Sequence, residues 1–280
     1  MTPTDVPTLI APTTNASPTR SPIPSQTSTG LPTLTKTPKS TATPTRSPTP
    51  SITPTATDTP RPVIPPSAIQ ILRPAPLSKI TSPLQVRVIL APGYGGIYKI
   101  ELLGEDGRLL ARQVLRYPGE RVNNSINLDF EIPGVAETGR LQVFTEDQYG
   151  RTIALSSTDI ILMSVGSDEY NPPGDLRERI FIQKPDSEDL ILGGSLTVFG
   201  KAYPGQDEPL LVELISESGA VVGQRLVAVQ AEEGEDYGIF TAEIPYKVSE
   251  ATPVRLTIFE DIDRIPGYTH ISTLEITINP

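Results

Sequence analysis

The chain of 280 residues contains no cysteine, no tryptophan and a single histidine, His270. Without cysteine there is no disulfide scaffold, no thiolate metal site and no cysteine nucleophile. A lone histidine also removes the main residue of histidine-rich metal sites and of most histidine-based acid–base schemes. No G-x-S-x-G or H-E-x-x-H pattern occurs. We therefore predict no catalytic, metal-binding or cofactor-binding residue, and a protein that is not an enzyme.

Long apolar runs are missing as well. The longest uninterrupted stretches, such as 160–163, are far shorter than the ~18–20 residues that a membrane-spanning helix needs. We therefore expect no membrane insertion within this chain. No basic segment followed by an apolar one opens the sequence. We expect any export signal or anchor to lie outside it.

Acidic residues outnumber basic ones, and the net charge is −10. The first 66 residues carry +3, so the remaining residues together carry −13. An acidic folded part repels phosphate backbones, whereas nucleic-acid binding needs the opposite sign. We therefore exclude nucleic acid as a partner.

The first 66 residues contain little that folding could bury. Thr, Ser and Pro account for 42 of them, and 16 of the 31 prolines lie there. Proline fixes φ and pushes the preceding residue toward extended conformations, which blocks helix formation. Few apolar side chains offset the entropy cost of ordering the backbone. We expect a disordered, semi-stiff stalk at 1–66, either unmodified or O-glycosylated on its hydroxyls.

The rest of the chain repeats itself, because residues 69–163 align with residues 180–278 at an offset of about 112. The matching segments are 69–74 with 180–185, 131–133 with 243–245 and, after a three-residue insertion, 141–144 with 256–259. Each copy is much longer than the ~20–50 residues of a solenoid unit. We therefore predict two domains, each with its own core.

Within each copy, apolar and polar residues alternate, as they do from Ile126 to Ile132. This period of two is typical of strands with one buried face, and turn signals such as Asp106-Gly107 separate the runs. The strands expected in the first copy are 69–72, 84–90, 98–104, 109–115, 125–132, 139–145 and 153–163. Those expected in the second are 180–183, 195–202, 210–216, 221–229, 238–244, 253–260 and 269–278.

Seven short strands in about 100 residues are typical of an immunoglobulin-like β-sandwich. The predicted fold class is all-β, with two tandem immunoglobulin-like β-sandwiches after the disordered Thr/Pro-rich stalk. We place the stalk at 1–66, the first sandwich at 67–164, a linker at 165–178 and the second sandwich at 179–280.

The second copy carries a more particular pattern. Ile-x-Ile-x-x-Pro at 180–185 is followed by Leu-Thr-Val-Phe-Gly-Lys-Ala at 196–202, and then by 212–219 and 238–246 with their glycines. This resembles the immunoglobulin-like domain of bacterial spore-germination proteins and envelope lipoproteins. The first copy departs from the pattern at 86–88 and in a glycine-rich insert at 93–96. The resemblance implies an extracytoplasmic binding or spacer module, and it carries no catalytic residues.

Two single features have plain structural interpretations. His270 lies in the last expected strand, and we interpret it as a strand residue, not as a ligand or base. The segment 93–96 is expected to be a flexible loop between strands, because no helix follows it to supply a phosphate-binding N-terminus.

Acidic clusters and tyrosines leave two kinds of binding open. Carboxylates at 146–147, 168–169, 186–189 and 260–263, together with Asp175, could bind calcium between the domains. None of these runs fits an EF-hand loop, and acidic loops usually only keep a surface soluble. Carbohydrate could bind to small aromatic platforms, which would be Tyr94 with Tyr98 or Tyr237 with Tyr246. The alternative is that these tyrosines only cover sheet edges.

Taken together, the sequence predicts a non-enzymatic bacterial cell-surface protein, located outside the cell, whose tandem modules are displayed on a stalk for structural or adhesive binding. The expected partner is a protein or a cell-wall glycan. The alternative is a glycan- or peptidoglycan-binding module that uses loop Tyr and Asp residues.

Overall fold

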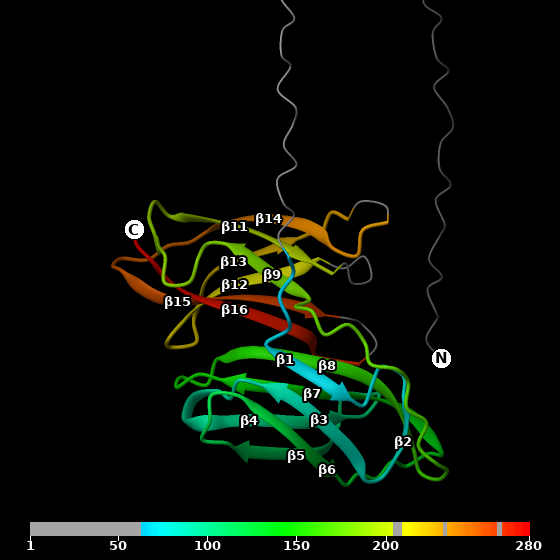
Figure 1. Cartoon of the computed structure of the whole chain (residues 1–280). Helices are drawn as coiled ribbons and strands as arrows, with labels where there is room; N and C mark the ends of the chain where they lie inside the picture. The colour runs from blue at the N-terminus through cyan, green and yellow to red at the C-terminus, as the bar shows by residue number, and fades with distance from the viewer. Residues whose placement is uncertain (1–62, 204–208, 232–233, 262–264) are drawn as a thin grey trace, which may run out of the picture. The chain divides into compact units, whose positions relative to one another are not determined.

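The computed structural model describes residues 63–203, 209–231, 234–261 and 265–280. The predicted stalk at 1–66 lies outside the described residues except for its last four. In the described part, the regular elements are strands apart from one short 3-10 turn, η1 (Tyr94–Gly96), which occupies the glycine-rich insert (Figure 1). The predicted all-β class, with two tandem immunoglobulin-like β-sandwiches, is confirmed.

The first copy contains each of the seven strands expected from alternation, with a short additional one. Its strands are β1 (Ile69–Arg73), β2 (Lys79–Thr81), β3 (Leu84–Leu90), β4 (Ile97–Leu103), β5 (Leu109–Arg116), β6 (Val122–Leu128), β7 (Ala136–Glu146) and β8 (Thr152–Met163). Strand β2 is the addition, and it pairs in parallel with β8. Only three residues long, β2 offers too few positions for alternation to show.

The second copy repeats this arrangement. Its strands are β9 (Ile180–Lys184), β10 (Leu190–Ile191), β11 (Ser195–Ala202), β12 (Leu210–Ser216), β13 (Val221–Val227), β14 (Gly238–Pro245), β15 (Thr252–Asp261) and β16 (Tyr268–Ile278). The short strand β10 again pairs in parallel with the last strand of its copy, β16.

Each copy buries its own core between two sheets. In the first, β1, β3 and β6 form a three-stranded sheet that packs against β4, β5, β7 and β8, with Val88 and Leu102 among the fully buried contacts. In the second, β9, β11 and β14 pack against β12, β13, β15 and β16, around residues such as Val198 and Leu256. The alternation of inward apolar and outward polar side chains produces both cores.

One strand ends earlier than the sequence predicts. Alternation extends to Ile132, but β6 stops at Leu128. The backbone then leaves the ladder, and the N–H of Phe130 donates to the Ser82 hydroxyl at 3.0 Å. Phe130 is still buried in the first core. The predicted strand 125–132 is therefore wrong in its second half, although the burial of Phe130 agrees with it.

The segment predicted as a linker, 165–178, is bonded to the first sandwich along much of its length. Lys79 and Glu169 exchange two backbone hydrogen bonds of 2.9 and 2.8 Å. Near its end, the N–H of Ser67 donates to Leu176, and the N–H of Glu178 donates to Pro65. These bonds fix the direction in which the chain enters β9. The domain boundaries given above stay a prediction.

A candidate binding site at the joint of the two sandwiches

The larger sheets of the two sandwiches are one continuous sheet. Strand β8 of the first copy pairs antiparallel with β16 of the second, placing Ser156 opposite His270 and Leu155 opposite Ile271 (Figure 1). The result is a ten-stranded sheet whose main path runs β13-β12-β15-β16-β8-β7-β4-β5. We call the region around the β8–β16 contact the joint.

The joint has local two-fold symmetry. In the first copy Phe144 pairs with Leu155, and in the second the corresponding Phe259 pairs with Ile271. Leu155 and Ile271 therefore occupy equivalent positions, and at the joint they pair with each other. An antiparallel contact between equivalent positions is the arrangement of a two-fold dimer interface.

Apolar side chains fill one part of the joint. Leu155, Phe259 and Ile271 are buried together, and the partly buried Phe144 and Leu211 pack against them. This cluster is separate from both sandwich cores. Its burial depends on the two sandwiches staying in contact, so it contributes stability to the joint itself.

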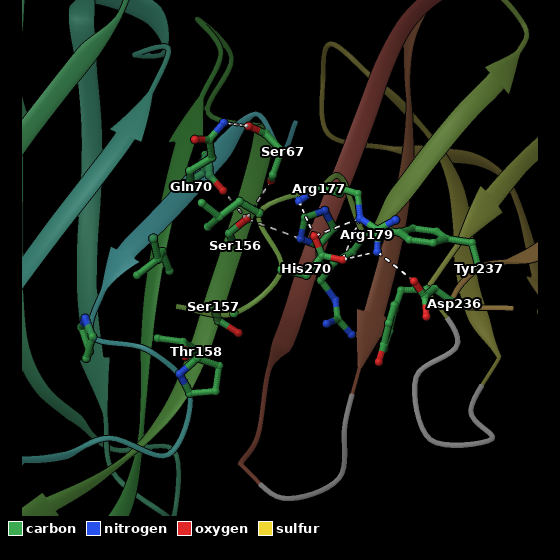
Figure 2. Close-up of a pocket in the computed structure, with 18 residues that line it drawn as sticks. Ser67, Gln70, Ser156, Ser157, Thr158, Arg177, Arg179, Asp236, Tyr237 and His270 are labelled. Atoms are coloured by element: carbon green, nitrogen blue, oxygen red, sulfur yellow. Dashed lines mark hydrogen bonds and ion pairs between the residues drawn. The ribbon is translucent and has the colours of Figure 1, made fainter. Parts of the chain in front are cut away.

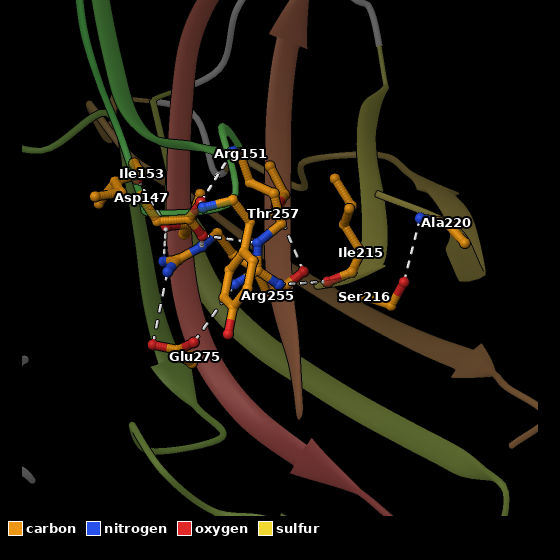
Figure 3. A network of polar contacts seen from close by, with 11 residues as sticks. Asp147, Arg151, Ile153, Ile215, Ser216, Ala220, Arg255, Thr257 and Glu275 are labelled. Carbon is orange, nitrogen blue, oxygen red and sulfur yellow. Dashed lines mark hydrogen bonds and ion pairs between the residues drawn. The ribbon is translucent and has the colours of Figure 1, made fainter. Parts of the chain in front are cut away.

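A buried ionic network crosses the joint beside this cluster (Figure 3). Asp147 accepts from Arg151 Nε at 2.7 Å and from Arg255 Nε of β15 at 3.2 Å. Arg151 Nη1 also donates to the carbonyl of Ile215 on β12 at 3.0 Å. Burial works to raise the pKa of Asp147, but hydrogen bonds from Arg151 and from the Tyr149 N–H lower it overall. The carboxylate therefore holds two arginines, one from each sandwich.

Arg140 of β7 makes a further contact across the joint. Its side chain is fully buried, and its Nε donates to Asp159 at 2.8 Å. Its Nη1 donates to the carbonyls of Ile265 and Gly267, at 2.8 and 3.1 Å, in the turn before β16. A single guanidinium thus connects β7 and β8 of the first sandwich to the last turn of the second.

Elsewhere at the joint, His270 of β16 is bonded to the linker. Its Nε2 lies 2.5 Å from Glu178 Oε1, and both side chains are buried. The other carboxylate oxygen of Glu178 accepts from the N–H of Ala68 at 3.1 Å. Burial works to raise the pKa of Glu178, but the hydrogen bond and charge of His270, with the backbone donors, lower it overall. His270 is the strand residue that was predicted, and it also fixes the linker.

Three side chains at the joint are arranged in the order of a catalytic triad. The nucleophile would be Ser156, the base His270 and the acid Glu178. The geometry does not activate the serine, however. The Ser156 hydroxyl lies 3.5 Å from His270 Nδ1 and donates to the carbonyl of Ile69 at 3.0 Å. Ser156 is also inside β8, with paired strands on both sides, where the ladder uses the backbone N–H groups that an oxyanion hole needs.

A cleft of about 370 Å³ opens beside the joint (Figure 2). Its lining combines hydroxyl groups of the first sandwich with arginine, tyrosine and aspartate side chains of the linker and the second. The polar and aromatic lining residues are Ser67, Gln70, Ser156, Ser157, Thr158, Asp175, Arg177, Arg179, Tyr203, Asp236, Tyr237 and His270. We call it the joint cleft. Its volume lies in the range of small-molecule sites.

Arginines and tyrosines alternate along one wall of the joint cleft. The rings of Tyr203 and Tyr237 meet edge to face, with centroids 5.8 Å apart at 83°. Arg177 lies 4.9 Å from the Tyr237 ring centre, and Arg179 lies 5.1 Å from that of Tyr203. These stacks hold the two rings at the cleft, where Tyr203 remains 39% exposed.

Carboxylates neutralise both arginines of this wall. Arg177 pairs with Asp175 at 2.6 Å and with Asp236 at 3.1 Å. Arg179 pairs with Glu260 at 2.7 Å. The hydrogen bond from Arg177 is the main cause that lowers the pKa of Asp175. Both arginines of the wall therefore have carboxylate partners, three carboxylates to two arginines.

The tyrosine platforms named from the sequence are not formed. Tyr98 is 1% exposed within the first core, where Asn124 donates to its hydroxyl at 2.9 Å. Of these two tyrosines, only Tyr94 is exposed. Tyr246 is likewise buried, in the second core, so it cannot make a platform with Tyr237. Tyr237 instead meets Tyr203, a pair that the sequence does not predict.

The acidic clusters are largely occupied by cations or donors of the chain itself. Glu146 is held by Lys99, Asp147 by Arg151, Asp168 by Thr81 and Tyr170, Glu169 by Lys79, Asp175 by Arg177, and Glu260 by Arg179. Asp263 lies outside the described residues. Within the described ranges, no group of three or more potential metal ligands gathers. Calcium would have to displace these partners before it could bind.

Comparison with known proteins finds no matching family model and no matching curated protein. Among solved structures, the titin domains Z1Z2 in complex with telethonin are 9% identical, with coverage of 76% of this chain and 96% of that chain and a TM-score of 0.20. Collagen adhesin from S. aureus is 8% identical, with coverages of 76% and 92% and a TM-score of 0.14. Dimeric latent PorU from Porphyromonas gingivalis is 7% identical, with coverages of 77% and 24% and a TM-score of 0.23.

Over the part of the chain that the structure describes, no helix is long and apolar enough to cross a membrane.

Proposed function

We propose that this chain is a non-enzymatic bacterial cell-surface protein whose two immunoglobulin-like modules act as one rigid unit for structural or adhesive binding. The observation that carries the proposal is the pairing of β8 with β16, which joins the larger sheets of both modules. A flexible tandem would present two independent surfaces. A continuous sheet presents one surface of fixed geometry, which is what a spacer or a binding unit requires.

The contacts around this pairing support rigidity. The apolar cluster at Leu155, the network at Asp147 and the bond between His270 and Glu178 lie in different parts of the joint. Each is buried, so opening the joint would expose apolar surface and leave ionised groups without partners. Interdomain contacts of this kind oppose the relative motion that tandem domains otherwise show.

The location at the cell surface rests on the sequence. A Thr/Ser/Pro-rich segment of 66 residues ahead of two small all-β modules fits a spacer between an anchor and a displayed unit. We also propose that the second module is of the spore-germination type. The pattern of that type has a glycine at position 200, and the packing around this position favours glycine. A Cβ there would lie 2.5 Å from both the Phe181 carbonyl and the Phe240 ring.

Rigidity can be measured with spin labels, since the absence of cysteine allows labelling without background. Gln85 on β3 and Thr197 on β11 are exposed, one on each module. In the full chain carrying Gln85→Cys and Thr197→Cys, we expect one narrow distance distribution by electron–electron double resonance. Adding Ile271→Asp should broaden it. A broad distribution without that change would show independent modules and overturn the proposal.

Two further tests address the other parts of the proposal. Intact cells that make the protein should lose it to external trypsin if it is displayed, whereas full protection would contradict a surface location.

A fluorophosphonate probe, which labels activated serines, should leave the protein unlabelled. Labelling that disappears in Ser156→Ala would show that the serine beside His270 is reactive after all.

A further inference from the structure

We infer that the joint cleft binds a neutral saccharide. The inference rests on the proposed function, because the cleft keeps its shape only if the joint is rigid. It differs from the platforms considered from the sequence, since its aromatic residues are Tyr203 and Tyr237 and its floor comes from β8 of the other module.

The lining of the cleft contains a buried hydroxyl group, that of Thr158. Thr158 is 8% exposed, and among the described residues its Oγ1 has no hydrogen-bond partner. Burying a hydroxyl without a partner costs free energy. Thr158 lines the cleft beside Ser157 (Figure 2). The Ser157 hydroxyl donates to the carbonyl of Thr269 at 2.9 Å. The lining of the cleft therefore includes a buried hydroxyl oxygen that has no hydrogen-bond partner among the described residues.

The opposite wall offers the other kinds of contact that a sugar uses. Tyr203 and Tyr237 are partly exposed and are held in place by their stacked arginines. Such rings present an apolar face together with a hydroxyl group. Asp175 and Asp236 supply acceptors, and Arg177 supplies donors in a fixed plane. A ring of carbon atoms with hydroxyl groups around its rim matches this combination of apolar faces and paired polar groups.

The ion pairs favour a neutral ligand over an anionic one. Arg177 and Arg179 are already paired with carboxylates, and His270 is paired with Glu178. An anionic ligand would have to displace Asp175 or Asp236 from Arg177. That exchange would leave a carboxylate of the protein without its partner, which is costly in a partly buried site. Hydroxyl groups can share these donors and acceptors without breaking the pairs.

The full chain tests this inference directly. Maltose, cellobiose and N,N′-diacetylchitobiose serve as neutral probes, and glucuronic acid serves as a charged one, in calorimetric titrations extended to millimolar sugar. We expect saturable binding of at least one neutral probe. Tyr237→Ala and Thr158→Val should each weaken that binding by about tenfold or more, which corresponds to about 1.4 kcal/mol.

Tyr94→Ala is the matched control, because Tyr94 is 65% exposed and does not line the joint cleft. It should leave binding unchanged. The melting temperature of each variant shows whether the fold is intact, and Thr158→Val keeps the shape of the side chain while removing only the hydroxyl.

Three results would overturn the inference: no binding of any neutral probe, binding that the two cleft variants leave intact, or tighter binding of glucuronic acid. Repeating the spin-label measurement on the same preparations separates the two proposals. A narrow distance distribution without sugar binding rejects the saccharide and leaves the rigid unit standing. A broad distribution rejects the rigid unit.

Discussion

Leu155 and Ile271 hold equivalent places in the two modules and face each other across the joint. Each lies next to the matching phenylalanine of its own module, and both are at least nine-tenths buried. This pair stands at the centre of the surface that turns two sandwiches into one unit. Its energetic weight is therefore the first quantity to measure.

Leu155→Ala and Ile271→Ala should each lower the free energy of unfolding by about 2–4 kcal/mol, because each removes buried apolar atoms and leaves a cavity. The double variant should lose less than the sum of the two, with a coupling energy of about 0.5–3 kcal/mol. Urea unfolding of the four proteins measures this. Strict additivity of the two losses would show that there is no energetic coupling between the two side chains.

Asp147→Ala should destabilise the protein by about 3–5 kcal/mol, because it leaves Arg151 and Arg255 buried without their shared carboxylate. The matched control is Asp106→Ala, since Asp106 also pairs with an arginine but is 62% exposed. The control should leave the unfolding free energy unchanged within error. An equal loss of unfolding free energy in the two variants would indicate that burial does not strengthen the contribution of the network at the joint.

Acid should weaken the joint through Glu178 and Asp147, whose pKa values are both lowered in the folded protein. A lowered pKa means that the ionised form is stabilised by folding. The contribution is thus fully present above the unfolded values of about 4.3 and 3.9, and it is lost as the pH falls through the folded values.

We expect the free energy of unfolding to fall as the pH drops from about 5 to about 3, and Glu178→Gln should flatten that dependence. The measurement is urea unfolding over this pH series. The same slope in the variant and the wild type would show that the bond between Glu178 and His270 does not contribute.

Gly200→Ala should destabilise the second module by about 1–3 kcal/mol, because the added Cβ meets the Phe181 carbonyl and the Phe240 ring at 2.5 Å. Gly134→Ala is the matched control, since its Cβ would find its nearest neighbour at 3.7 Å. The control should change stability by less than about 1 kcal/mol. Thermal unfolding distinguishes the two, and a tolerated Gly200→Ala would mean that β9 and β14 can move apart.

Alternation predicted most of the strands because a buried face repeats at every second residue. Tyr98 lies in the predicted strand 98–104 and shares its face with Ile100 and Leu102, which are fully buried. That register buries its ring, so Tyr98 does not form a platform with Tyr94. The short strands β2 and β10 left no such signal, because two or three residues cannot show a period.

The candidate site could not be predicted in the same way. The joint cleft depends on β8 meeting β16, and no local pattern encodes a pairing between strands more than a hundred residues apart. His270 was correctly placed in a strand, but its partner Glu178 lies in a segment that reads as a linker. In the sequence, Thr158 is an ordinary strand residue. Only the structure shows that its hydroxyl has no hydrogen-bond partner within the described ranges.

The local two-fold symmetry at the joint has an evolutionary consequence. A single-module ancestor that met a second copy of itself through its last strand would already possess this contact, so duplication and fusion of its gene would require no new interface. Fusion also frees the two halves from remaining identical. The position of Ala154 in the first half is taken by His270 in the second, as their hairpin partners Thr145 and Glu260 show. A homodimer of identical chains could not keep a histidine on one side of its symmetry axis and an alanine on the other.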